Sequence, residues 1–226
     1  VIPAYQPDNK LIKLIEKIHE KSDFRILVID DGSSSKCQNI FDKAEQYATV
    51  LRHQVNQGKG QALKTAFDYI RQQNSYGTVV TADADGQHKI WDIFRTANKA
   101  SENPNKLILG VRAFTGKVPL RSRFGNSLTK ALFKIQTGVE VADTQTGLRA
   151  FTTNLIPFML KIEGNRYEYE MNMLLEATKE YQILEVPIET VYINDNEGSH
   201  FRPIRDGLMI YKNIFKFALS SLSSFV

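Results

Sequence analysis

Short apolar runs alternate with longer amphipathic segments along most of the chain. The runs are rich in Val, Ile and Leu, which is typical of strands buried on both faces of a parallel sheet. They lie at Val1–Tyr5, Ile26–Asp31, Thr49–His53, Thr78–Asp83, Lys106–Arg112, Leu148–Thr152 and Ile183–Pro187. The segments Asp8–Lys21, Ser35–Ala48 and Gly60–Gln73 carry apolar residues at helical spacing. This alternation predicts an α/β fold, with a mostly parallel sheet flanked by helices.

Two later segments are amphipathic. Leu120–Gln136 and Ile204–Val226 each place apolar residues on one stripe of a helix, and the second becomes apolar all round towards its end. The basic residues of the first are Arg121, Arg123, Lys130 and Lys134. A basic amphipathic helix can lie on a membrane surface, or it can bury its apolar face in the core. The second segment can likewise pack on the domain or mediate a dimer.

Composition and charge narrow the class of protein. The chain has 226 residues, and its net charge of +4 allows a phosphate-bearing partner without requiring one. Cys37 is the only cysteine, so no internal disulfide can form. No run reaches the roughly 18 apolar residues of a membrane span. Because the chain begins inside a strand-like run and ends without a helix stop signal, we expect it to be the soluble part of a longer protein.

Polar residues gather after several predicted strands, where ligands of parallel sheets bind. Asp83 and Asp85 follow the fourth strand and are separated by one small residue. Two such carboxylates can converge on Mg²⁺ or Mn²⁺, although Asp and Gly are also common in a capped turn. An EF-hand is excluded, because the sixth position from Asp83 is His88 rather than glycine.

The glycines around Lys59 do not complete a known phosphate-binding motif. A P-loop would need Ser or Thr after Lys59, where the chain has Gly60. A dinucleotide fingerprint would need Gly or Ala at position 63, which is Leu63. The sequence therefore predicts a flexible loop that brings one cation near the acidic edge.

Five segments together resemble family-2 glycosyltransferases, which have the Rossmann-like GT-A fold. They are PAYQP at Pro3–Pro7, VIDDGS at Val28–Ser33, NQGKGQAL at Asn56–Leu63, DADGQH at Asp83–His88 and DTQTGLRAF at Asp143–Phe151. The last resembles the polyprenyl-phosphate branch, which includes dolichol-phosphate mannosyltransferases and bacterial undecaprenyl-phosphate glycosyltransferases. The resemblance spans nearly the whole chain.

The resemblance implies an inverting enzyme that moves one sugar from a nucleotide-sugar to a polyprenyl phosphate. A UDP-sugar is the favoured donor and GDP-mannose an alternative. The implied metal ligands are Asp83, Asp85 and Gln87, which would hold Mg²⁺ or Mn²⁺. The implied nucleotide-binding residues are Pro3, Ala4, Tyr5, Asp30, Lys59, Asp83 and Ala84. The implied catalytic residues are Asp83, Asp85, Asp143 and Gln145, and those implied for the acceptor and its phosphate are Arg112, Arg123, Arg149, Ser199, His200 and Arg202.

Two departures from the family pattern weaken parts of this assignment. Some relatives have a lysine where this chain has His200, and many have Asn-Glu where it has Gln6 and Pro7. The resemblance also implies a domain over residues 1–203, then a juxtamembrane helix over 204–226 that leads into a membrane domain. The enzyme would act at the cytoplasmic face of the membrane, without nucleic acid, and could form a homo-oligomer through the membrane domain.

Two other functions remain open on the sequence. A family-2 transferase could extend a saccharide, with Asp143, Glu168 or Glu170 as the base that activates a sugar hydroxyl. The second open function is that of a module that binds sugar nucleotides without catalysis. A lipid phosphate differs from a hydroxyl, because its second pKa near ~6 makes it nucleophilic without a base. It would instead need cations to position it, as arginines do.

Overall fold

The computed structural model describes residues 1–74, 77–112 and 120–189, with backbone only for residues 120–128. The predicted residues Ser199, His200 and Arg202, and the segment Ile204–Val226, lie outside the described residues. Only the backbone of Arg123 is described.

The described residues form seven short strands, which lie side by side in the order β3-β2-β1-β4-β6-β5-β7. Their bounds are β1 Ile2–Ala4, β2 Leu27–Asp30, β3 Thr49–Arg52, β4 Thr78–Thr81, β5 Lys106–Arg112, β6 Arg149–Thr152 and β7 Gln182–Ile188. The two parts of the sheet join where the Val1 nitrogen donates to Val80 O (2.8 Å) and Ala82 N donates to Val1 O (3.0 Å). Because Val1 bonds to residues on either side of Thr81, β1 and β4 are parallel.

Among the described strands, only β6 runs antiparallel to its neighbours, pairing with both β4 and β5. The other described pairs, β1–β2, β2–β3 and β5–β7, are parallel. The prediction of a mostly parallel sheet is therefore confirmed, and each of the seven predicted strands is present. Strand β5 has the predicted bounds, β7 is one residue longer at each end, and the other five are shorter than predicted.

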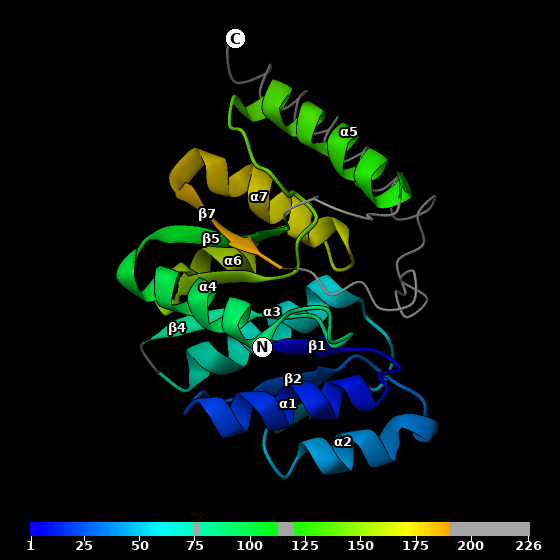
Figure 1. The fold of residues 1–226 in the computed structure, drawn as a ribbon. Coiled ribbons are helices and arrows are strands. Elements are labelled where there is room, and N and C mark those ends of the chain that lie inside the picture. The colour runs from blue at the N-terminus through cyan, green and yellow to red at the C-terminus, as the bar shows by residue number, and fades with distance from the viewer. Residues whose placement is uncertain (75–76, 113–119, 190–226) are drawn as a thin grey trace.

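Helices cover both faces of this sheet (Figure 1). Their bounds are α1 Asn9–Lys21, α2 Gln38–Ala44, α3 Lys59–Gln72, α4 Ile90–Glu102, α5 Leu120–Thr137, α6 Ile156–Lys161 and α7 Glu168–Glu180, with 3-10 turns at Ser35–Cys37 and Thr153–Leu155. One core joins α1, α2 and α4 to the sheet, through residues such as Leu11, Phe41 and Ile93. A second joins α3, α6 and α7, through residues such as Phe67 and Met159, and a third, smaller one packs α3 on β2.

Four of the described helical regions differ from the sequence prediction. The predicted helix Ser35–Ala48 is a 3-10 turn followed by α2, which ends at Ala44. Helices α4, α6 and α7 were not predicted. Helix α4 does carry apolar residues at helical spacing, Ile90, Ile93, Ala97 and Ala100, so the sequence contained the signal and the prediction overlooked it. Helix α7 is buried at most of its first eight positions, so it has no polar stripe to mark it.

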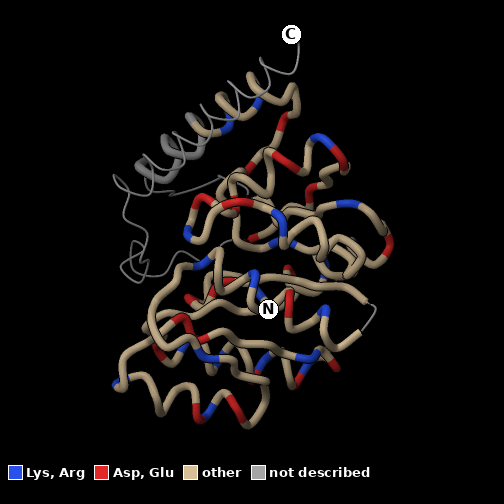
Figure 2. Tube along the Cα trace, turned by 180° about the vertical axis from the view of Figure 1, so that it is seen from behind, with Lys and Arg blue, Asp and Glu red and all other residues tan. Residues whose placement is uncertain are grey.

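Helix α5 lies beyond α7, apart from the sheet (Figure 1). Its Phe133 is fully buried in the core that includes α7, whereas Ile135 is 80% exposed. The described part of α5 therefore buries one apolar side chain in the core and exposes another. No described helix is long and apolar enough to cross a membrane. Lys, Arg, Asp and Glu are intermixed along the chain trace (Figure 2).

Candidate active site

The turn after β3 is fixed by the carboxylate of Asp31, which is buried at the end of β2. Its Oδ1 accepts from Gln57 N (2.9 Å) and lies 2.8 Å from His53 Nδ1, while its Oδ2 accepts from Gly58 N and from Asn56 Nδ2, both at 2.8 Å. An ionised carboxylate offers about four acceptor positions, so these contacts satisfy it. Asp31 thus anchors the turn from which α3 begins.

The neighbouring Asp30 organises the ends of β1 and β2. Its Oδ1 accepts from Ser33 N (2.8 Å), and Ser33 Oγ accepts from Gln6 N (2.9 Å). Gln6 has a φ of 50°, so the chain turns sharply as it leaves β1. The residues predicted to bind the nucleotide at these strand ends are Pro3, Ala4, Tyr5 and Asp30. The structure brings them together, although Ala4 and Asp30 are buried.

The glycines beside Lys59 allow α7 to approach α3 closely. A Cβ atom on Gly58 would lie 2.5 Å from Asn165 O, and one on Gly60 would lie 2.5 Å from the Cβ of Tyr169. Gly58 also has a φ of 103°, which favours glycine. The prediction of a flexible loop is therefore wrong: Lys59 and Gly60 form the first turn of α3. The packing against α7, which the sequence did not reveal, requires both glycines.

Lys59 joins the end of β4 to the start of α7. Its Nζ lies 2.7 Å from Oδ1 of Asp83 and 2.9 Å from Oε2 of Glu170. Burial by itself lowers the pKa of Lys59, but the charges of Asp83 and Glu170 outweigh burial and raise it above its usual value. Lys59 is therefore a fixed ammonium that holds two carboxylates of different elements together.

The acidic turn after β4 contains two carboxylates with different environments. Burial raises the pKa of Asp83, but Lys59 and His88 outweigh it and hold that pKa well below its usual value. His88 Nε2 lies 3.3 Å from Asp83 Oδ2. For Asp85, burial and then the charge of Asp83 raise the pKa, while its Oδ1 accepts from Gln87 N (2.9 Å). A further positive charge at this turn would relieve the repulsion between the two aspartates.

A divalent ion fits this turn only if a substrate supplies part of its coordination. Asp83 and Asp85 provide two carboxylates, but no group of three or more His, Cys, Asp or Glu side chains in the described chain could hold a metal ion. Mg²⁺ in proteins is usually bound by one or two carboxylates together with substrate phosphates. The donor set therefore suits an ion that arrives with, or is completed by, a phosphate-bearing ligand.

Asp143 is fully buried and paired with Arg112 at the end of β5. Arg112 donates to it through Nε (2.5 Å) and Nη2 (3.0 Å), a two-bond geometry that is stronger than a single contact. Gln145 N also donates to Asp143 Oδ1 (3.1 Å). A cavity of about 40 Å³ is lined by Asp83, Gln87, His88, Arg112, Gln145, Thr146 and Gly147. The structure thus gathers predicted metal, catalytic and acceptor residues around one small space.

Arg149 does not face this cavity. It is 1% exposed and donates to the backbone oxygens of Thr146 (3.0 Å) and Glu170 (2.6 Å). Its Nη2 is buried without a hydrogen-bond partner among the described residues. Arg149 therefore joins β6 to the start of α7, and it has no surface for direct contact with an acceptor. Its place as an acceptor ligand, implied by the resemblance, is not supported by this geometry.

Sequence reasoning missed Asp31 and Gly147, and it named Glu170 only as a possible base rather than as a partner of Lys59. Asp31 fixes the turn before α3, Glu170 pairs with Lys59, and Gly147 lies against Asp83. A Cβ atom on Gly147 would lie 2.4 Å from Asp83 Oδ2, so the carboxylate occupies the space of a side chain. The only signals in the sequence were the second aspartate of the VIDDGS segment, the acidic pair at Glu168 and Glu170, and the glycine of the DTQTGLRAF segment.

Comparison with known proteins agrees with this arrangement. The chain is 26% identical over 213 residues to the UDP-N-acetylglucosamine–dolichyl-phosphate N-acetylglucosaminyltransferase of Methanococcus voltae, covering 85% of this chain and 84% of that protein. It is 26% identical over 251 residues to the dolichyl-phosphate beta-glucosyltransferase of Saccharomyces cerevisiae, covering 95% of this chain and 72% of the relative.

The fold is also similar to that of a solved enzyme. Glucosyl-3-phosphoglycerate synthase from Mycobacterium tuberculosis, in complex with Mn²⁺, UDP-glucose and glycerol 3-phosphate, superimposes with a TM-score of 0.69 at 18% identity. The match covers 97% of this chain and 77% of that one, and at this identity it shows a common fold. The family described as Glycosyl transferase family 2 matches residues 1–159, which is most of the chain. The protein therefore belongs to glycosyltransferase family 2 and has its GT-A fold.

Proposed function

We propose that this enzyme transfers one sugar from a nucleotide-sugar to a polyprenyl phosphate. Two relatives that align over most of the chain support this proposal, because their names specify dolichyl-phosphate acceptors. UDP-sugars are the favoured donors, because one of these relatives is named for UDP-N-acetylglucosamine. GDP-mannose remains the alternative donor.

The structural observation that carries this proposal is that the three candidate bases are already engaged in ion pairs or hydrogen bonds. A saccharide hydroxyl would need a general base to remove its proton. Asp143 is paired with Arg112, and Glu170 is paired with Lys59. Glu168 accepts from the backbone nitrogens of Asn165 (3.0 Å) and Arg166 (3.1 Å). A phosphate acceptor requires no base, so it fits a site in which these carboxylates are already engaged.

On the donor side, the acidic turn would hold the diphosphate through a divalent ion. Asp83 and Asp85 would be its protein ligands with Gln87 beside them, and Mg²⁺ or Mn²⁺ supplies charge stabilisation for a departing nucleotide. Lys59 and His88 keep Asp83 ionised and fix its position. The strand ends of Pro3–Tyr5 and Asp30 would bind the base and ribose, and Ala84 would lie beside the donor.

On the acceptor side, positive side chains would position the lipid phosphate for attack. Arg112 lies at the small cavity, where it also orients Asp143. Arg123, Ser199, His200 and Arg202 remain proposals for this role. A long polyprenyl tail stays in the bilayer, so the site would work at a membrane surface. The cytoplasmic face and a homo-oligomer formed through a membrane domain also stay proposals.

An assay with purified protein tests the proposal. Radiolabelled UDP-glucose, UDP-N-acetylglucosamine and GDP-mannose would each be incubated with undecaprenyl phosphate or a short saccharide, with Mn²⁺ or EDTA. We expect label in the lipid extract only with polyprenyl phosphate and Mn²⁺. Asp85→Asn should reduce this transfer at least ~100-fold, whereas Asp42→Asn, on an exposed residue of α2, should leave it unchanged. Label on the saccharide instead would refute the proposed acceptor.

Arg123→Ala separates acceptor binding from chemistry. We expect the KM for undecaprenyl phosphate to rise while the KM for the nucleotide-sugar stays the same, because the lost charge would contact only the lipid phosphate. Lys130→Ala, another basic residue of the same helix, is the matched control. Equal KM values for both variants and the unmodified enzyme would remove Arg123 from the acceptor site.

A further inference from the structure

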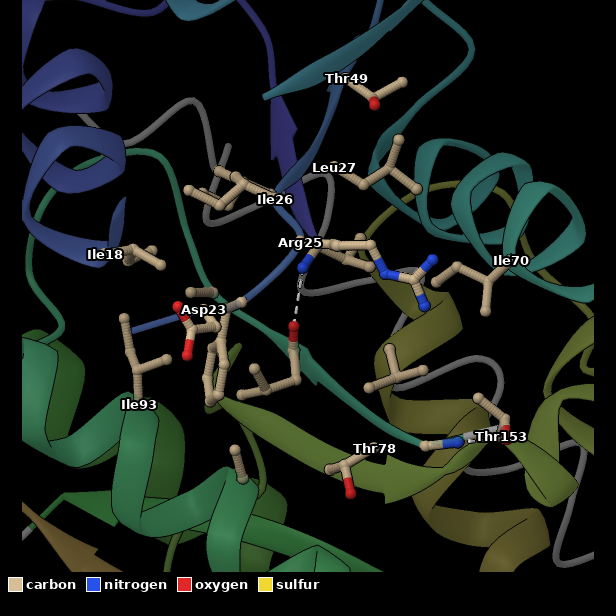
Figure 3. Close-up of a pocket in the computed structure, with 18 of the residues that line it drawn as sticks. Ile18, Asp23, Arg25, Ile26, Leu27, Thr49, Ile70, Thr78, Ile93 and Thr153 are labelled. Carbon is tan, nitrogen blue, oxygen red and sulfur yellow. Dashed lines mark hydrogen bonds between the residues drawn. The ribbon is translucent and has the colours of Figure 1, made fainter. Parts of the chain in front are cut away.

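Arg149 lies at the end of β6 that is nearest the acidic turn. Across the antiparallel pair with β4 it is opposite Thr81, and Asp83 follows two residues later. Thr78 lies at the far end of the same pair, beside a cavity of about 440 Å³ that is also lined by Thr153 (Figure 3). The length of the strand pair therefore separates Arg149 from that cavity and places it next to the acidic turn.

One arm of the Arg149 guanidinium holds the segment that packs against Asp83. Its Nε donates to Thr146 O (3.0 Å), directly before Gly147. Thr81 Oγ1 fixes the next peptide group by donating to Gly147 O (2.8 Å). Asp83 fills the space where a side chain of Gly147 would lie, since an added Cβ would be 2.4 Å from Asp83 Oδ2. This first arm therefore fixes the wall against which one oxygen of Asp83 rests.

The other arm of the guanidinium holds the start of α7. Nη1 of Arg149 donates to the backbone oxygen of Glu170 (2.6 Å). The side chain of Glu170 pairs with Lys59 (2.9 Å), and the same ammonium lies 2.7 Å from Asp83 Oδ1. Through Glu170 and Lys59, the second arm thus reaches the other oxygen of Asp83. Both routes connect Arg149 to Asp83 through intermediate residues.

The charge of Arg149 completes the balance of the buried site. Apart from Arg149, the described ion pairs here join three carboxylates to two permanent cations: Asp83, Asp143 and Glu170 to Lys59 and Arg112. Burial lowers the pKa of the Arg149 guanidinium, and the charges of Glu170 and Asp143 act against this effect. Because arginine stays charged at neutral pH, Arg149 supplies a third positive charge to these three carboxylates.

A role in stability alone does not explain a charged residue at this position. Arg149 is 1% exposed, and its Nη2 is buried without a hydrogen-bond partner among the described residues. Burying a charge that is incompletely hydrogen-bonded is unfavourable, and well-packed apolar side chains of similar volume often stabilise such a position equally well. The advantage of the arginine is therefore expected in the placement of the groups that it holds.

We propose that Arg149 is a positioning residue for sugar transfer, which fixes Asp83 from one side through Thr146 and Gly147 and from the other through Glu170 and Lys59. This role replaces the acceptor contact that the sequence resemblance implied. It rests on the proposed function, because Asp83 is the carboxylate on which the donor site depends. Arg149 itself touches neither substrate and acts only through the groups that it holds.

The test compares Arg149→Lys with Phe67→Leu, whose ring contacts Phe151 of the same strand and lies outside the site. Lysine keeps the charge but cannot reproduce the two fixed donors of a guanidinium. Transfer from UDP-N-acetylglucosamine to undecaprenyl phosphate would be measured well below either Tm. We expect kcat to fall at least ~20-fold in Arg149→Lys, because displacement of Asp83 misplaces the donor site. The KM for undecaprenyl phosphate should stay within about twofold, since Arg149 does not contact the lipid.

Phe67→Leu should lower Tm but keep kcat within about twofold, because a smaller core side chain changes stability without moving Asp83. Arg149→Met removes the charge and both donors, so its kcat should fall further, by at least ~100-fold. If the Met variant does not fold, Arg149→Lys alone decides the test.

Two results would overturn the positioning role. One is a kcat in Arg149→Lys equal to that of Phe67→Leu, and the other is a raised KM for undecaprenyl phosphate with unchanged kcat, which would make Arg149 an acceptor ligand. Asp83→Asn, in the same assay, tests the proposed function separately. Full activity in Asp83→Asn, or no transfer by the unmodified enzyme, would refute the proposed function and this inference with it.

Discussion

The ammonium of Lys59 lies 2.7 Å from the carboxylate of Asp83, and this contact ties the first turn of α3 to the acidic turn after β4. Lys59 has 18% of its side chain exposed, so solvent screens the pair only in part. The same ammonium reaches Glu170 of α7. One cation therefore positions the carboxylate on which the proposed donor site depends.

Replacing Lys59 should disable the site more than it destabilises the fold. In Lys59→Met, Asp83 and Glu170 would lose their shared cation and repel each other, which would raise the pKa of Asp83 from its lowered value. We expect kcat/KM to fall at least ~100-fold and the free energy of unfolding to fall by about 2 kcal/mol. Steady-state transfer and urea unfolding measure the two effects, with Lys43→Met, on the exposed side of α2, as the control.

Glu170→Gln distinguishes the two partners of Lys59. The variant keeps a hydrogen-bond acceptor beside Lys59 but removes one negative charge, and Asp83 remains paired. We expect a loss in kcat/KM of about tenfold, smaller than that of Lys59→Met, because Glu170 acts by positioning. An equal loss in both variants, together with an altered pH profile in Glu170→Gln, would indicate that Glu170 itself takes part in proton transfer.

Gly147→Ala should displace Asp83 while leaving most of the fold intact. The added methyl would lie 2.4 Å and 2.7 Å from the two carboxylate oxygens, closer than nonbonded atoms approach. Because misplacing a reacting group by about 1 Å can cost ~100-fold in rate, we expect a loss of that order in kcat. Gly77→Ala is the matched control, since nothing lies within 4 Å of its added Cβ. Full activity in Gly147→Ala would mean that Asp83 does not need its present position.

Asp31→Asn should lower the stability of the protein, because it weakens the turn before α3. In either orientation, the amide nitrogen of asparagine would face two of the groups that now donate to the carboxylate. We expect the free energy of unfolding to fall by about 3 kcal/mol, since Asp31 is buried and each hydrogen bond to a charged group contributes about 1.5–3 kcal/mol. Chemical denaturation measures this loss, and Asp42→Asn, half exposed on α2, should change it by less than ~0.5 kcal/mol.

The strands and the location of the site could be predicted because both depend on local patterns. Each strand is a short apolar run, and polar residues such as Asp30 and Asp83 lie at its end or just after it. The direction of β6 could not be predicted, because its own four residues, Arg149–Thr152, do not specify whether the neighbouring strands run with or against it. Pairing direction is set by the path of the whole chain.

Contacts between distant segments account for the rest of the site. The sequence indicates that Lys59 and Asp83 both lie near the acidic edge, but Glu170 reaches them only because α7 packs on α3 through Gly58 and Gly60. The buried position of Arg149 follows from the same packing, since it donates to the first turn of α7. A motif can therefore place a residue near a site without showing which way its side chain points.

The amino terminus of the 226-residue chain contributes a pH dependence of stability that does not involve the active site. Burial lowers the pKa of the Val1 ammonium from 8.0 to about 5 in the folded state, so between these values the unfolded chain binds more protons. Stability should therefore rise as the pH increases from 5 to 8 and level off above 8. Urea unfolding at pH 5, 6, 7 and 8 measures this slope. Acetylation of the Val1 nitrogen removes the titrating group, so the acetylated chain should lose this contribution to the slope. The same slope in both chains would assign the pH dependence to other groups.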